Sequence, residues 1–126
     1  MTDLWLAQFD EMDSAATHIF MYSMGADGLE ITPLGTLRLF ADHSDAHGDA
    51  HLGRVAVEKS SRGQGLGALM MERAHTDAQS MGFKRAIIHA QEDKSGFYSR
   101  LGYLVTDSTV FYEEGIAHIK MAKSLF

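Results

Sequence analysis

The sequence predicts a single mixed α/β domain that spans residues 1–126. Two neighbouring features carry this prediction. An apolar run from Leu52 to Val57 leads through a glycine-rich loop into an amphipathic segment from Gly65 to Met81, and a second apolar run, Arg85 to Ala90, follows. A strand, a helix and a strand in this order imply parallel neighbours joined by a right-handed crossover. We therefore expect a mixed central β-sheet flanked by helices.

Alternating apolar and polar residues predict four further strands around this unit. They lie at Thr17 to Tyr22, Leu34 to Phe40, Tyr103 to Phe111 and Ile116 to Ala122. The turn-forming segment Gly25 to Gly28 should join the first two as a hairpin. A second short helix is expected at about Lys94 to Leu101, and the apolar cluster within Met1 to Asp13 is expected to form a short helix or a docking arm.

The composition narrows the possible functions. The formal net charge of −6 argues against a nucleic-acid-binding protein, because neutralising phosphates requires clustered Lys and Arg. No apolar run approaches the roughly 18 residues of a membrane span, and no signal peptide is recognisable, so we expect a cytoplasmic protein. The lack of cysteine excludes a disulfide framework, a thiolate metal site and a cysteine nucleophile.

Histidines and aspartates alternate before the first apolar run. The alternating residues are His43, Asp45, His47, Asp49 and His51. In an extended segment all five would share one face, which is a plausible ligand set for zinc or another divalent ion. The alternative is a solvated loop between two strands, which Gly48 and the small alanines favour. We expect the loop and no metal site.

The loop Arg62-Gly63-Gln64-Gly65-Leu66-Gly67 has the properties of an anion cradle. Glycines allow close backbone approach and positive φ, and the free N–H groups of a helix N-terminus attract negative charge. A Walker A loop is excluded because Ala68 and Leu69 stand where that motif needs a lysine and a hydroxyl. The glycine spacing of a Rossmann turn is also absent. A pyrophosphate would nevertheless be well bound here.

The pattern Arg-x-x-Gly-x-Gly after a Val-x-Val strand resembles the acetyl-CoA-binding motif of the GCN5-related N-acetyltransferases (GNAT). The run from Ile87 to Gln91, followed after five residues by Phe97 to Tyr103, is similar to that family's second cofactor motif. The segment from Tyr112 to Met121 resembles the C-terminal signature of its ElaA-like branch. The resemblance covers roughly Phe9 to Lys123 and implies a GNAT-like fold with a shortened N-terminal region.

The resemblance implies a set of residues that bind acetyl-CoA as co-substrate. The backbone of Arg62, Gly63, Gln64, Gly65, Leu66 and Gly67 would hold the pyrophosphate, Val55 and Val57 the pantetheine arm, and Gln91 and Tyr98 would also contact the cofactor. In the family, the strand that carries Val57 splays away from the next strand, and the thioester lies in the gap. A main-chain N–H of that strand would meet the oxyanion.

For catalysis, Tyr98 matches the family tyrosine that donates a proton to the departing thiolate, although packing of an aromatic pair with Phe97 is the alternative. A phenol pKa near 10 and a thiol pKa near 8.5 would make this transfer nearly balanced. His51, expected on the same strand face as Val55 and Val57, and His118 are candidates for the general base, and Arg54 for orienting an acceptor carboxylate or phosphate. Each of these three has an equally plausible structural role.

The sequence thus predicts an acetyl-CoA-dependent N-acetyltransferase that acetylates a primary amine of a small molecule or a protein by direct attack. The shortened N-terminal region keeps an alternative open, namely a catalytically weak or inactive acyl-CoA-binding module of the same fold. The resemblance also implies that the longer helical region that relatives have before the equivalent of Phe9 forms one wall of the acceptor pocket. A homodimer whose partner supplies this wall is compatible with catalysis.

Overall fold

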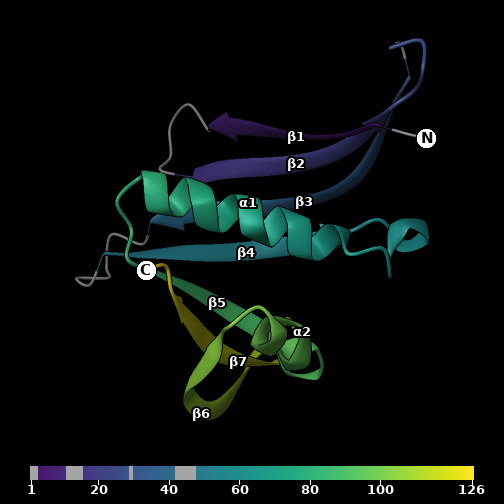
Figure 1. Cartoon of the computed structure of the whole chain (residues 1–126). Coiled ribbons are helices and arrows are strands. Elements are labelled where there is room, and N and C mark those ends of the chain that lie inside the picture. Colours follow the sequence, from purple (N-terminus) through teal and green to yellow (C-terminus); the bar gives the residue numbers. More distant parts are fainter. Residues whose placement is uncertain (1–2, 11–15, 29, 42–47) are drawn as a thin grey trace.

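The computed structural model describes residues 3–10, 16–28, 30–41 and 48–126. These residues form one seven-stranded sheet in the order β1-β2-β3-β4-β5-β7-β6 (Figure 1). The strands are β1 (Asp3–Asp10), β2 (Ala16–Met24), β3 (Ile31–Ala41), β4 (Asp49–Val57), β5 (Arg85–Gln91), β6 (Leu104–Glu113) and β7 (Ile116–Ser124). Only β4 and β5 pair in parallel, and every other pair is antiparallel. The mixed α/β fold predicted from the sequence is confirmed.

Two α-helices accompany this sheet, α1 (Leu66–Ser80) and α2 (Ser95–Arg100), and each follows a short 3₁₀ helix, η1 (Lys59–Ser61) or η2 (Glu92–Lys94). The predicted helices and the β2–β3 hairpin are therefore present, with boundaries shifted by a few residues. Within the described ranges, no helix is both long and apolar enough to cross a membrane.

The N-terminal segment differs from the expectation. It forms neither a helix nor an arm, because β1 pairs along its full length with β2, from Asp3 opposite Met24 to Asp10 opposite Thr17. An exposed strand edge is a ready partner for an extended segment, which explains this outcome. Residues 11–15, which connect the two strands, lie outside the described residues.

The main helix α1 lies across one face of the sheet, over β2, β3 and β4 (Figure 1). Its buried residues are Leu66, Met70, Met71, Ala74 and Ala78. The methionines Met70 and Met71 are core residues, whereas Leu69 and Met81 are exposed. The packing is close at β3, where a Cβ on Gly35 would lie 2.8 Å from Met70 Cε. The α1 face therefore carries the main hydrophobic core.

The parallel strands β4 and β5 stay paired over only part of their length. Pairing runs from Asp49 opposite Arg85 to Leu52 opposite Ile88. Beyond that point β4 remains paired with β3 as far as Val57, and β5 remains paired with β7. Residues 53–57 and 89–91 consequently diverge, as the resemblance implied, and the facing backbone groups no longer bond to one another.

A β-bulge in β4 lies at this divergence. Gly53 is opposite Arg38 and Ala56 is opposite Thr36, so Arg54 and Val55 together face a single residue of β3. Arg54 has a φ of 52°, a left-handed conformation that side chains other than glycine seldom adopt. The extra residue shifts the side-chain alternation by one, so β4 presents different faces before and after the bulge.

Candidate functional site

The glycine-rich loop ends directly at the N-terminus of α1. Gly63 and Gly65 have φ angles of 83° and 76°, which require glycine, and Gly65 is the residue that caps the helix. No side chain caps this N-terminus and no acidic residue lies in the first turn, so the helix presents its N–H groups and its positive dipole end without a competing anion. Arg62 Nε donates a hydrogen bond of 3.1 Å to the Val57 carbonyl, which ties the loop to the end of β4.

A cavity of about 630 Å³ lies against this loop, and we call it the loop cavity. Its lining residues come from the end of β4, the loop, the first turn of α1, and α2: Val55, Ala56, Val57, Ser61, Arg62, Gly63, Gly65, Leu66, Gly67, Ala68, Lys94, Phe97 and Tyr98. Gly67 is a point of close approach, because a Cβ there would lie 3.2 Å from Phe97 Cζ. Most of the residues predicted to bind a cofactor therefore line one cavity.

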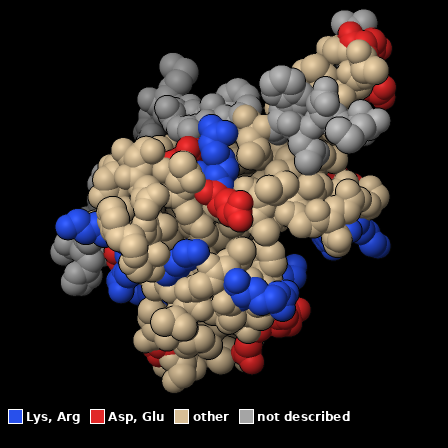
Figure 2. Space-filling model, viewed as in Figure 1, with Lys and Arg blue, Asp and Glu red and all other residues tan. Residues whose placement is uncertain are grey.

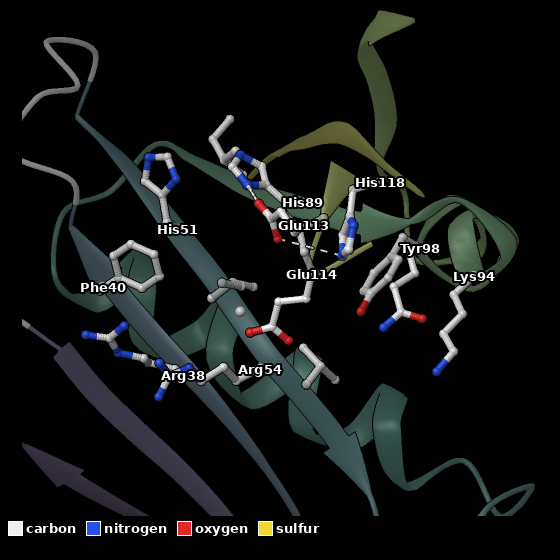
Figure 3. Close-up of a pocket in the computed structure, with 16 residues that line it drawn as sticks. Arg38, Phe40, His51, Arg54, His89, Lys94, Tyr98, Glu113, Glu114 and His118 are labelled. Atoms are coloured by element: carbon white, nitrogen blue, oxygen red, sulfur yellow. Dashed lines mark hydrogen bonds and ion pairs between the residues drawn. The ribbon is translucent and has the colours of Figure 1, made fainter. Parts of the chain in front are cut away.

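A second cavity, of about 480 Å³, lies where β4 and β5 diverge, and we call it the sheet cavity (Figure 3). It receives polar and charged side chains from β3, β4, β5, η2, α2 and the β6–β7 hairpin. They are Arg38, His51, Arg54, His89, Gln91, Lys94, Tyr98, Glu113, Glu114 and His118. Val55, Lys94 and Tyr98 line both cavities. The two cavities thus meet at the divergence.

Tyr98 is held at this junction by aromatic packing on α2. Its side chain is buried, and its ring makes edge contacts with Phe97 at 5.0 Å and Tyr103 at 5.9 Å between centroids. Burial raises the pKa of Tyr98 to about 12. The phenol is therefore protonated at any physiological pH, but it is a weaker acid than the sequence-based comparison with an ordinary tyrosine assumed.

His118 lies in β7 opposite Gln91 and is mostly buried. Its Nδ1 is 2.7 Å from the Ile116 carbonyl oxygen, which can only accept a hydrogen bond, so Nδ1 carries the proton in the neutral ring. The Nε2 lone pair then remains available, and Glu113 Oε2 lies 3.7 Å from it. Glu113 also contacts His89 Nδ1 at 3.1 Å. Figure 3 shows His118, Glu113 and Tyr98 on neighbouring parts of the cavity wall.

His51 does not share a face with Val57, contrary to the expectation. His51 is opposite Phe40 and stacks on its ring at 5.5 Å, whereas Val57 is opposite Gly35, which faces α1. Residues six apart would share a face in a regular strand, but the bulge at Arg54 and Val55 changes the alternation. His51 therefore lines the sheet cavity, away from the loop cavity.

The other predicted residues divide between the two cavities. Gln91 lines the sheet cavity with Arg54 and His118, and Gln64 is exposed in the loop and lines neither cavity. For the alternating histidines and aspartates, His43, Asp45 and His47 lie outside the described residues. Asp49 is buried and forms an ion pair with Arg85, with 2.7 Å between Oδ2 and Nη2, so its carboxylate already has a cationic partner.

Comparison with known proteins identifies the family. The family described as "Acetyltransferase (GNAT) domain" matches residues 9–125. The chain belongs to the GNAT family of acetyltransferases. The fold and the family predicted from the sequence are thereby confirmed.

Individual relatives of this GNAT chain support the same family assignment. The uncharacterized N-acetyltransferase YjcF of Bacillus subtilis is 33% identical over 119 residues, which are 92% of this chain and 76% of YjcF. An acyl-CoA N-acyltransferase from Pseudomonas aeruginosa superposes with a TM-score of 0.67 at 30% identity, covering 86% of this chain and 68% of that one. Escherichia coli ElaA shares the fold, with a TM-score of 0.72 at 18% identity over 98% and 99% of the two chains. The GNAT chain is accordingly an acyltransferase.

Four charged residues of the GNAT chain's sheet cavity were not singled out as site residues from the sequence, namely Arg38, Lys94, Glu113 and Glu114. Arg38 alternates with Leu37 and Leu39, so its position on the polar face of a strand was readable, but nothing in the sequence places it near β5. The two glutamates belong to a turn whose residues usually face solvent. Only the folded β6–β7 hairpin brings them beside His118.

His75 of α1 and Tyr103 form a pair behind the site, with 2.7 Å between Nε2 and Oη. Burial, together with the positive charge of Lys123, lowers the pKa of His75 to about 4. Burial likewise raises the pKa of Tyr103. The pair is thus neutral, and it joins the core helix to the segment that carries Tyr98, which contacts the Tyr103 ring.

This pair predicts acid sensitivity of the fold. Between pH 6.5 and about 4 the unfolded chain binds a proton at His75 that the folded chain does not, so stability is complete above pH 6.5 and falls as the pH drops toward 4. We expect His75→Gln to flatten this part of a plot of melting temperature against pH. His89→Gln, an exchange at an exposed histidine, serves as the control and should keep the slope. An unchanged slope in His75→Gln would contradict the assignment.

Proposed function

We propose that this chain is an acetyl-CoA-dependent N-acetyltransferase that acetylates the primary amine of an acceptor by direct attack. One observation carries the proposal: the loop cavity and the sheet cavity meet at the divergence of β4 and β5, and Tyr98 lines both. This arrangement suits a reaction in which a cofactor enters from one side and an amine from the other.

The loop cavity suits coenzyme A. The uncapped N-terminus of α1 and the positive-φ glycines offer backbone N–H groups to the pyrophosphate. The unpaired edge of residues 53–57 can bond to the amide groups of the pantetheine arm, as an added strand bonds to a sheet edge. In the family, an N–H of this strand also meets the oxyanion, and we propose the same for this chain.

In the proposed reaction the neutral amine nitrogen attacks the thioester carbonyl, an N–C bond forms, and the C–S bond breaks. The proton that the nitrogen then loses is taken up by the departing thiolate, directly or through water, which gives the amide and free coenzyme A thiol. A proton must first leave the acceptor ammonium, and we propose that His118 Nε2 accepts it, directly or through water. The neighbouring Glu113 carboxylate would stabilise the resulting imidazolium. We favour His118 over His51 because its free nitrogen is fixed by the Nδ1 contact with Ile116.

The role of Tyr98 follows from its raised pKa. Moving a proton from a phenol with a pKa of about 12 to a thiolate with a pKa near 8.5 is unfavourable by about 5 kcal/mol. We therefore propose that Tyr98 mainly donates a hydrogen bond to the departing sulfur, which stabilises the developing thiolate. Since the phenol stays protonated, this hydrogen bond is available at any pH below about 10.

A second candidate function is acyl-CoA binding without efficient turnover. The feature that favours it is the shortened N-terminal region. The resemblance implies a longer helical region before the equivalent of Phe9 that forms one wall of the acceptor pocket, whereas residues 3–10 form only the strand β1. The two candidates differ in one measurement, the release of coenzyme A thiol with and without amines. A rate that rises with an added amine supports the transferase, and a slow rate that no amine changes supports the binding module.

The first prediction from the proposed function concerns the affinity for acetyl-CoA. We expect Gly65→Val to weaken acetyl-CoA binding at least about tenfold in calorimetry, because a side chain at a φ of 76° distorts the loop. Gly28→Val is the matched control: Gly28 has a φ of 72° and equally open surroundings, but it lies in the β2–β3 turn. It should lose similar stability and keep its affinity. Equal affinities of the two variants would contradict the assignment of the loop.

The second prediction concerns the leaving group. We expect Tyr98→Phe to lower kcat about 100-fold while the KM for acetyl-CoA changes little, because the hydroxyl acts as the thiolate develops. Tyr103→Phe removes another buried hydroxyl and should instead lower the melting temperature, through the lost contact with His75. If Tyr98→Phe turned over as fast as the wild type at every pH, Tyr98 would have no such role.

The third prediction concerns the base. We expect His118→Gln to lower kcat/KM about 100-fold and to remove the acidic limb of its pH profile, which reports the loss of a neutral base. His89→Gln removes the other histidine in contact with Glu113 and should retain that limb. An acidic limb that persists in His118→Gln would transfer the role to another group, of which His51 is the next candidate.

A further inference from the structure

The charged side chains that line the sheet cavity are mostly cationic, although the whole chain is acidic. The whole chain has a formal net charge of −6, and acidic and basic groups are interspersed on the face seen in Figure 2. The cavity, by contrast, is lined by three cationic side chains and two carboxylates, with Arg38, Arg54 and Lys94 against Glu113 and Glu114. The acceptor therefore meets an excess of positive charge at the place where its amine must bind.

Among the residues that line the sheet cavity, Arg38 is the best candidate for binding an anionic group of a ligand. Its guanidinium carbon lies 4.8 Å above the centre of the Phe40 ring, which fixes the side chain along the cavity wall. Its Nε is buried, and no hydrogen-bond partner for it exists among the described residues. A buried N–H without a partner is costly unless a ligand supplies one. Within the same residues, no carboxylate pairs with Arg38.

Arg54 adds a second guanidinium at the same end of the cavity. Gly53, its chain neighbour, is opposite Arg38 in the sheet, and Figure 3 shows both arginine side chains on the β3–β4 side. Among the described residues, Arg54 also lacks an ion pair. Two arginines on adjacent strands are well suited to a carboxylate or phosphate, which each can bind through paired N–H groups.

Glu114 provides the opposite charge. In Figure 3 its carboxylate lies between the two arginines and Tyr98, and no ion pair of Glu114 is found in the described part of the chain. Glu114 and Gly115 form the two-residue loop between β6 and β7, and their φ angles of 51° and 78° are those that a tight hairpin loop requires. The hairpin thereby fixes the position of Glu114 at the cavity.

We propose that the acceptor amine carries an oxyanion group, as an amino acid does, with the oxyanion bound by Arg38 and Arg54 and the ammonium facing Glu114. This inference rests on the proposed acetyl transfer and names its substrate class. A polyamine fits the cavity less well, because its second cation would lie against the arginines. The cavity volume of about 480 Å³ is in the range of small-molecule sites.

The first experiment compares acceptors that differ only in the oxyanion. Initial rates of acetyl transfer are measured with amino acids, their amides, the corresponding amines without a carboxyl group, phosphate-bearing amines and a diamine. We expect kcat/KM to be at least about tenfold higher for the oxyanion-bearing amines than for their amides. Carboxylate and phosphate acceptors are separate arms, and preference for either supports the proposal. Equal or higher rates with neutral amines or the diamine would overturn it.

The second experiment tests the two arginines. Arg38→Met keeps an unbranched aliphatic stem while it removes the guanidinium that lies over Phe40, and Arg54→Asn uses a residue that tolerates positive φ. We expect each variant to raise the KM for the preferred acceptor at least about tenfold, and to change the KM for its amide little. Arg100→Gln, at the exposed end of α2 and outside both cavities, is the control for a lost positive charge. An equal change of KM for acid and amide would overturn the proposal.

A binding measurement separates this inference from the proposed function. Amino acids and their amides are titrated calorimetrically into the wild type, Arg38→Met and Arg54→Asn, each with coenzyme A present. Binding of the acids that weakens in both variants supports the oxyanion site even if no amine is acetylated, and in that case only the transferase proposal fails. Turnover of amines together with no preference for acids, in rates or in binding, overturns the inference and leaves the transferase proposal intact.

Discussion

The loss of pairing between β4 and β5 beyond Leu52 and Ile88 is the constraint on which the site depends. A parallel sheet normally continues its hydrogen-bond ladder, and interrupting it leaves polar backbone groups that need other partners. Here each strand keeps its outer neighbour, β3 for β4 and β7 for β5, so the sheet remains intact on both sides of the opening. The result is a rigid gap whose walls are backbone edges. These edges can bond to a chain that carries amide groups, as an added strand bonds to a sheet edge.

The aromatic groups beside the gap determine what kind of chemistry it can perform. Tyr98 and Tyr103 have raised pKa values and His75 has a lowered one, all because burial disfavours the charged form. The aromatic groups next to α2 are therefore neutral and supply hydrogen bonds, while Lys94, directly before α2, is the cationic group on that side. The side next to β3, β6 and β7 carries arginine, glutamate and histidine side chains.

Most of the fold was readable from the sequence, because period-two and helical patterns are local properties. The strand–loop–helix unit from Leu52 to Met81 and the hairpins followed from them, and three motifs in order indicated the family. The N-terminal strand could not be predicted from such patterns, since its pairing depends on the free edge of β2. Likewise, the position of His51 could not be predicted, because a bulge has no clear signature when Arg54, not glycine, takes the positive φ. The grouping of Arg38 with Glu114 depends on long-range packing alone.

The bulge at Arg54 and Val55 also makes β4 a strand of two independent halves. Residues before it, such as His51, belong to the sheet cavity, and those after it, such as Val57, face α1 and the glycine loop. Substitutions in the first half can therefore change the lining of the sheet cavity without touching the part that resembles the family's cofactor motif. Insertion or deletion of one residue in the first half of β4 would instead affect both halves of the strand, because every side chain beyond that point would exchange faces. Divergence among such proteins is thus expected to proceed in this strand by exchange of residues at constant length.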